Sequence, residues 1–147
     1  MWNEIITPED ITCLMAAFGH FHDSCIKEIR YISGAFVTEE MAMNPVNSKR
    51  IVDVVFQRQY QNPTAIVLRF VGLNVLHLVP CDDNYTCEIH SAAAFFRDGR
   101  VYWADCADVA EGEAESYDGT WICASKLRWR AADEFIGENE IFGTKLE

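Results

Sequence analysis

Apolar residues near the N-terminus recur with the spacing of an amphipathic helix. They fall at positions i, i+3, i+4 and i+7 and share one helical face: Ile11, Leu14, Met15 and Phe18. Just before them, Thr7 offers a capping hydroxyl and Pro8 suits the first helical position. Glu9 and Asp10 favour the positive end of a helix dipole, and Gly19 is typical of a helix stop. The pattern predicts one helix between Thr7 and Gly19.

After residue 24 the apolar pattern takes the period of two that is typical of strands. Between residues 51 and 60, one face carries Val52, Val54 and Phe56, and the other face is polar: Asp53, Gln57 and Gln59. A turn at 61–63 precedes a strand with Ile66, Leu68 and Phe70 on one face, and Gly72 interrupts that strand. Residues 25–37 are rich in strand formers but contain several charged residues, so we expect a bulged or partly exposed edge strand.

The clearest turn in the sequence is Asp98-Gly99, because this dipeptide readily supplies the positive φ angles of a tight hairpin. The hairpin places Phe96 opposite Val101 and Phe95 opposite Tyr102. The last predicted strand alternates a cationic face with an apolar face, and the apolar face comprises Trp121, Cys123, Leu127 and Trp129.

These elements predict an α+β fold in a single domain, residues 1–147. One N-terminal amphipathic helix covers a strongly twisted, mainly antiparallel sheet of about six to seven strands. A half-closed β-barrel is the alternative, because so many strands must curl or split to bury their apolar faces. The segments 37–50 and 107–118 are predicted to be loops.

The composition indicates a globular protein. Of the 147 residues, 50% are hydrophobic, and no apolar run approaches the roughly 18 residues needed to span a bilayer. The N-terminus lacks the basic and apolar regions of a secretory signal, so we expect a soluble, cytoplasmic protein. The six cysteines show no CxxC pair and are expected to be free, small hydrophobic residues.

Charge is the second informative property. The chain has 12 basic and 23 acidic residues, a formal net charge of −11. The stretch 105–118 contains no basic residue, and its acids are the candidate partner-binding residues: Asp105, Asp108, Glu111, Glu113, Glu115 and Asp118. Such a surface repels nucleic acid and anionic membranes and attracts a basic protein. The alternative is a solvated loop that only maintains solubility.

Polar and titratable residues gather at the junction between the helix and the first long strand. They are candidates for a functional or a structural junction: His20, His22, Asp23 and Cys25. A metal site would need a further ligand, such as His77 or His90, and the spacing favours a structural role for these residues. Cys25 would be a nucleophile only if an imidazole reached it. We therefore predict no catalytic residue, no metal and no cofactor.

The junction also carries a resemblance. Residues 21–29, Phe-His-Asp-Ser-Cys-Ile-Lys-Glu-Ile, resemble the FHD-(S/A)-x-(I/V) opening of several small, uncharacterised bacterial families. Some of these families are described as immunity proteins of polymorphic toxin systems. The resemblance implies a bacterial cytoplasmic protein without a catalytic role, and a toxin partner that is neutralised by surface complementarity. It also implies an architectural role for Phe21 and Asp23.

Two functions of different class follow from these observations. The first is a non-catalytic, acidic protein-binding module of immunity-protein type, with a basic toxin as its partner. The alternative is a small-molecule-binding domain or small enzyme with a pocket near His20, His22 and Asp23. Aromatic residues of the curved sheet would line that pocket: Tyr31, Phe56, Tyr60, Trp103 and Trp129. The sequence leaves the oligomeric state and the role of the C-terminal tail open.

Overall fold

The structure is a computed structural model that describes residues 1–109 and 112–143. The helical segments of the described residues are α1 (Pro8–Ala17) and the 3-10 turns η1 (Gly19–Phe21), η2 (Ala114–Ser116) and η3 (Asp133–Phe135). The strands are β1 (Asn3–Ile5), β2 (Ser24–Ile32), β3 (Phe36–Val37), β4 (Met43–Asn44), β5 (Ile51–Arg58), β6 (Ala65–His77), β7 (Ala93–Arg97), β8 (Arg100–Ala104) and β9 (Trp121–Ala131). None of the described helices has the length and apolar character needed to cross a bilayer.

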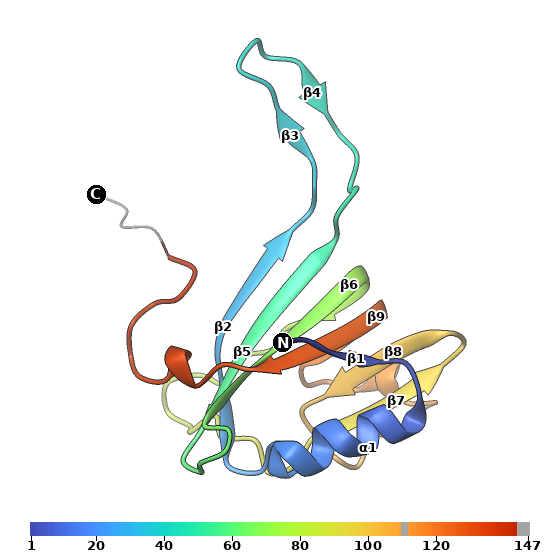
Figure 1. Cartoon of the computed structure of the whole chain (residues 1–147). Coiled ribbons are helices and arrows are strands. Elements are labelled where there is room, and N and C mark those ends of the chain that lie inside the picture. Colours follow the sequence, from blue (N-terminus) through green and yellow to red (C-terminus); the bar gives the residue numbers. More distant parts are fainter. Residues whose placement is uncertain (110–111, 144–147) are drawn as a thin grey trace.

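The main sheet has seven strands, all paired antiparallel. Its order is β2-β5-β6-β9-β8-β7, and β1 also pairs with β9. Figure 1 shows α1 lying across one face of this twisted sheet. The predicted α+β fold is confirmed, and the described strands form no closed barrel.

Helix α1 begins where the sequence predicted. The Thr7 hydroxyl accepts a hydrogen bond from the Asp10 amide, and the Asp10 carboxylate accepts hydrogen bonds from the amides of Ile6 and Thr7, both at 2.9 Å. This reciprocal capping box satisfies amides that have no partner inside the helix.

The core lies between α1 and the facing side of the sheet. The predicted apolar stripe of the helix is part of this core. Fully buried aromatic side chains gather around Phe21 in the core: Phe18, Phe56 and Trp103. The ring of Phe21 contacts the other three edge-on or tilted, at centroid distances of 4.9 to 5.6 Å. Edge-to-face contacts of this kind add stability beyond that of area burial.

The β7–β8 hairpin has the predicted register. Phe96 pairs with Val101 and Phe95 pairs with Tyr102, whose rings stack at 5.1 Å. The Asp98-Gly99 turn provides the positive φ angles of 52° and 74°.

The prediction that β9 has a single apolar face is wrong. Leu127 joins the core beneath α1, whereas Trp121 and Cys123 lie in a separate cluster on the other face. The change occurs opposite Gly72 of β6, which has a φ of +68° and packs so closely on Ser125 of β9 that a side chain there would crowd it; a bulge between Leu73 and Val75 follows in β6. The side chains of β9 alternate between the two faces on both sides of this point, but the alternation is shifted by one residue.

The second face of the sheet is covered by two segments. Residues 106–109 and 114–117 cover the β8–β9 end, and Phe135, Ile141 and Phe142 cover the β5–β6 end. The amides of Ile141 and Phe142 donate to the Glu28 carboxylate at 2.6 and 2.9 Å. Residues 141 and 142 of the C-terminal tail are therefore attached to β2.

Strands β3 and β4 form a separate two-stranded hairpin. We call residues 33–50 the arm, since Figure 1 shows this segment rising away from the body beyond the ends of β2 and β5. The segment 37–50 was predicted to be a loop, and it contains this ordered ribbon instead.

Candidate functional site

The junction between α1 and β2 is a left-handed turn. Gly19, His20 and Phe21 have φ angles of 56°, 56° and 63°, and Asp23 has a φ of 54°. A left-handed conformation costs a residue with a side chain roughly 1–2 kcal/mol. Such strain persists only where the surroundings enforce it.

Two backbone hydrogen bonds and one from a side chain enforce the turn. The Ala92 amide donates to the His20 carbonyl at 2.9 Å, and the Asp23 amide donates to the Ile89 carbonyl at 2.8 Å. The buried Ser24 hydroxyl donates to the Phe21 carbonyl at 2.7 Å. Together with the burial of the Phe21 ring, these contacts attach the turn to the segment that leads into β7.

His22 and Asp23 form an exposed pair at this turn. Nδ1 of His22 lies 2.7 Å from the His90 carbonyl oxygen and therefore carries a proton, because a carbonyl oxygen only accepts. Nε2 of His22 lies 3.3 Å from the Asp23 carboxylate, which forms an ion pair only when the imidazole is protonated on both nitrogens. The two side chains are 60% and 65% exposed. At the start of β2, the side-chain hydrogen bond to the backbone comes from Ser24. The Asp23 carboxylate lies next to the His22 imidazole instead.

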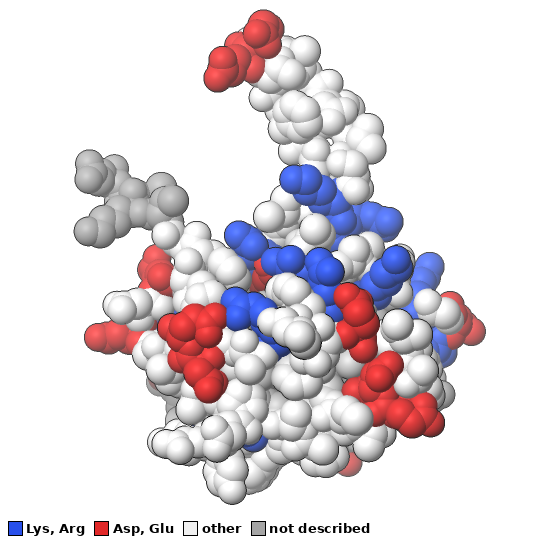
Figure 2. All heavy atoms as spheres, in the orientation of Figure 1, with Lys and Arg blue, Asp and Glu red and all other residues white. Residues whose placement is uncertain are grey.

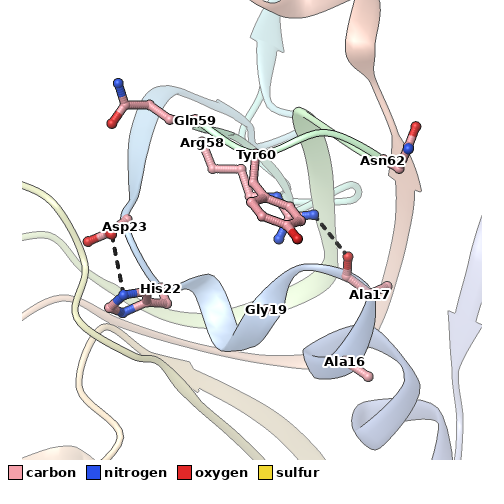
Figure 3. A pocket seen from close by; sticks show the side chains of 9 residues that line it. All are labelled: Ala16, Ala17, Gly19, His22, Asp23, Arg58, Gln59, Tyr60 and Asn62. Atoms are coloured by element: carbon pink, nitrogen blue, oxygen red, sulfur yellow. Dashed lines mark hydrogen bonds and ion pairs between the residues drawn. The ribbon is translucent and has the colours of Figure 1, made fainter.

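A hollow of about 480 Å³ lies beside this pair, between the end of α1 and the end of β5. Arg58 projects into it between Tyr60 and the backbone of Ala17, as Figure 3 shows. Its guanidinium donates to the Pro63 carbonyl at 2.9 Å and to the Ala17 carbonyl at 3.3 Å. Arg58 thereby satisfies a backbone carbonyl at the C-terminal end of α1.

The other candidates of the junction are not gathered around one reacting centre. The His20 side chain is exposed, and Cys25 lies on β2 beside a second open hollow of about 630 Å³ that Cys87 also lines. Burial, followed by the nearby Cys87 thiol, raises the pKa of the Cys25 thiol above its ordinary value. A raised pKa keeps a thiol protonated and weakens it as a nucleophile.

The two remaining histidines, His77 and His90, make contacts of other kinds. Nδ1 of His77 lies 2.7 Å from the Gly119 carbonyl at the far end of β6, and His90 offers its backbone carbonyl to His22. Within residues 1–109 and 112–143, no group of three or more His, Cys, Asp and Glu side chains is placed to hold a metal ion. The aromatic residues expected to line a pocket are also separated, because Phe56 and Trp103 are fully buried and Tyr60 is exposed.

His22→Ala is expected to lower the free energy of unfolding by only about 1 kcal/mol, since it removes a single hydrogen bond from an exposed side chain. Urea denaturation of the full chain measures this change. His20→Asn is the matched control, because asparagine tolerates the left-handed conformation and the His20 side chain is exposed. A loss above about 3 kcal/mol for His22→Ala would contradict a peripheral role for this imidazole.

The predicted acidic run divides into two groups. Asp105 accepts a hydrogen bond from the Tyr117 hydroxyl, and Glu115 accepts hydrogen bonds from Arg97 and from the Tyr102 hydroxyl. Burial and the Asp105 carboxylate raise the pKa of Tyr117, which keeps its hydroxyl a donor. These contacts hold the loop on the sheet.

The second group of acids faces solvent. Asp108, Glu113 and Asp118 are exposed around a hollow of about 360 Å³ that Tyr117 also lines. Glu111 lies outside the described residues. The loop is therefore anchored by some of its acids, and the others are presented outwards.

A charged row crosses the second face of the sheet, and the sequence reasoning missed it. Five residues on neighbouring strands lie opposite one another in register: Arg30, Asp53, Arg69, Arg128 and Glu4. Asp53 was assigned to a polar face, yet it is only 1% exposed. Arg30 and Arg69 donate to its carboxylate at 2.7 to 2.9 Å. The Trp2 ring lies over Arg69 and Arg128, at 4.7 and 5.2 Å.

The acidity of Asp53 reflects two opposing effects. Burial by itself would raise the pKa of this carboxyl, but hydrogen bonds from Arg69 and then Arg30 outweigh burial and hold the pKa below its ordinary value. Asp53 is therefore ionised at neutral pH and joins β2, β5 and β6.

The arm is the second feature that sequence reasoning missed. Large apolar side chains are half to four-fifths exposed along it: Phe36, Val37, Met41, Met43 and Val46. The signal was available in the sequence, because residues 31–48 contain only two charged side chains among many apolar ones.

Comparison with known proteins gave no match: no family model fits the chain, and neither curated proteins nor solved structures include a significant relative.

Proposed function

We propose that this chain is a non-catalytic protein-binding module whose main contact surface is the arm. The observation that carries the proposal is the exposure of apolar side chains on an ordered element, with Met41 81% and Met43 70% exposed. Several large apolar side chains exposed together on one element are uncommon on soluble domains and are typical of protein interaction sites. An elongated ribbon offers no enclosed cavity for a small molecule, whereas a protein partner can cover it.

The acidic loop supports the finer proposal of an immunity-type partner. Its exposed carboxylates, Asp108, Glu113 and Asp118, are held on a loop whose Val109 and Ala114 are buried. An anchored acidic surface raises the association rate of a basic protein and favours it over acidic competitors. The resemblance of residues 21–29 to families that include toxin-neutralising proteins supports the same choice.

The test is site-specific photo-crosslinking in a bacterial host. A photoreactive amino acid replaces Phe36 or Met43 on the arm, and the matched control replaces Tyr60, which is 73% exposed on the body. We expect covalent adducts with a protein at the arm positions and a much lower yield at Tyr60. Equal yields at all three positions would overturn the proposal.

A further probe at Glu113 tests the finer proposal separately. We expect its adduct to contain a protein of net positive charge, and we expect the yield to fall as salt is added during irradiation of a cell extract. An acidic partner, or a yield that is insensitive to salt, would contradict steering by the acidic loop while leaving the result for the arm unchanged.

A further inference from the structure

The arm carries its charges only at its two ends. Within residues 31–50 the charged side chains are Glu39 and Glu40 at the tip and Lys49 and Arg50 at the base. Figure 2 shows this arrangement directly, with an acidic tip, an uncharged shaft and a basic region where the shaft meets the body. Most of the exposed apolar side chains lie on the shaft between the two charged ends, namely Phe36, Val37, Met43 and Val46, and Met41 lies at the tip.

Backbone contacts order both ends of the arm. At the tip, the amides of Met41 and Ala42 donate to the backbone oxygen and the hydroxyl of Thr38, at 2.9 and 3.1 Å. At the base, the amides of Lys49 and Arg50 donate to the Ser33 carbonyl at 2.9 and 3.1 Å. The charged residues therefore have defined places at opposite ends of the ribbon.

The base continues into a wider basic surface. The guanidinium of Arg50 donates to the Leu73 carbonyl at 3.3 Å, which fixes it beside Gly72 and the bulge that begins at Leu73. On the strand next to this bulge, Lys126 pairs with Val71 and is exposed. Lys126 is thus a further exposed cation, on the strand that pairs with β6.

We infer that the arm binds the arm of a second copy of this chain, with the two arms antiparallel. The inference rests on the protein-binding function proposed above and names the partner of that same surface. A two-fold axis across the middle of the shaft brings the acidic tip of each arm to the basic base of the other. Because a two-fold interface uses the same patch on both subunits, a patch that is acidic at one end and basic at the other is self-complementary.

The same charge pattern disfavours an unrelated partner on the arm. A basic protein that gained contacts at Glu39 and Glu40 would meet repulsion from Lys49 and Arg50, and an acidic protein would meet the reverse. The pairing of apolar shafts also explains the exposed Phe36 and Met43, because each shaft removes the other from water. An isolated two-stranded ribbon is marginal in water, and a second ribbon beside it adds the support it lacks.

The test is a charge exchange between two variants of the full chain, followed by sedimentation equilibrium at low salt. We expect the wild type to form a dimer that salt weakens. Glu39→Lys/Glu40→Lys makes both ends of the arm basic, and Lys49→Glu/Arg50→Glu makes both ends acidic. Each variant alone is expected to dimerise at least about tenfold more weakly, since like charges then face each other at both ends. An equal mixture is expected to recover the wild-type affinity within about threefold, because every tip again meets a base of opposite sign.

Asp82→Lys/Asp83→Lys is the matched control, with the same change of charge on an exposed loop outside the arm. It is expected to dimerise like the wild type, and circular dichroism with urea denaturation checks that all variants fold. A mixture that fails to recover would overturn the antiparallel arrangement.

A wild type that stays monomeric up to about 1 mM would overturn the second copy as partner. If its arm still crosslinked to a different protein, the proposed function would stand. A monomer whose arm formed no adduct would contradict both proposals.

Discussion

Asp53→Ala is expected to lower the free energy of unfolding by about 3 kcal/mol, the lower end of what breaking a buried ion pair costs. The carboxylate is 1% exposed and receives hydrogen bonds from two arginines on neighbouring strands. Its removal leaves Arg30 and Arg69 without their shared anion. Both are partly exposed, so water reduces the penalty and places it near the lower end. Chemical denaturation of the full chain measures the change.

Glu4→Ala is the control within the same charged row. The Glu4 carboxylate lies 3.7 Å from Arg128 and is 52% exposed, so its loss is expected to cost less than about 1 kcal/mol. Equal losses for Asp53→Ala and Glu4→Ala would contradict the special position of Asp53.

The contribution of Asp53 also depends on pH. Its pKa in the folded protein lies below the ordinary value of 3.8, so its stabilisation is present above that value and is lost as the pH falls through the lower, folded pKa. The difference in stability between the wild type and Asp53→Asn should therefore be constant near neutral pH and shrink below pH 3.8. A difference that stayed constant under acid conditions would show that the charge of Asp53 contributes nothing.

Local signals in the sequence were sufficient for the elements whose structure depends on neighbouring residues. The capping residues Thr7 and Asp10 fixed the start of α1, and Asp98-Gly99 fixed the hairpin and its register. In both cases the side chains that determine the geometry lie within a few residues of the backbone they satisfy.

The failures arise from contacts between distant segments. The alternation of β9 breaks because of Gly72, a residue of another strand that lies next to Ser125. The alternation of polar and apolar residues in β5 predicts that Asp53 faces solvent, because nothing within β5 indicates the arginines on β2 and β6. Pairing across strands decides both outcomes, and it cannot be read from one strand.

The candidate site divides in the same way. The sequence located the polar junction and the acidic run, but it could not tell which acids hydrogen-bond to neighbouring side chains. Asp105 and Glu115 are held by Tyr117 and Arg97, while Asp108 is exposed. The arm was treated as a loop because it contains turn residues such as Asn44 and Pro45, and the exposure of its apolar residues depends on its direction in space.

Phe21→Ala is expected to be as damaging as the loss of Asp53, at about 3–5 kcal/mol, because it removes a fully buried ring from a cluster of aromatic side chains. Phe36→Ala is the matched control, since it deletes the same side chain from the exposed arm and should leave the stability of the monomer nearly unchanged.

The left-handed backbone at Phe21 is expected to reverse the usual order of stability of alanine and glycine variants, which burial alone would not do. With a φ of 63°, alanine at this position keeps the strain of a side chain, whereas glycine releases it. Phe21→Gly should therefore be more stable than Phe21→Ala by about 1 kcal/mol, although glycine ordinarily destabilises. Urea denaturation of the three variants decides the matter. If alanine proved the more stable of the two, the turn would not hold Phe21 in a strained conformation, and the junction would owe its shape to the hydrogen bonds of His20, Asp23 and Ser24 alone.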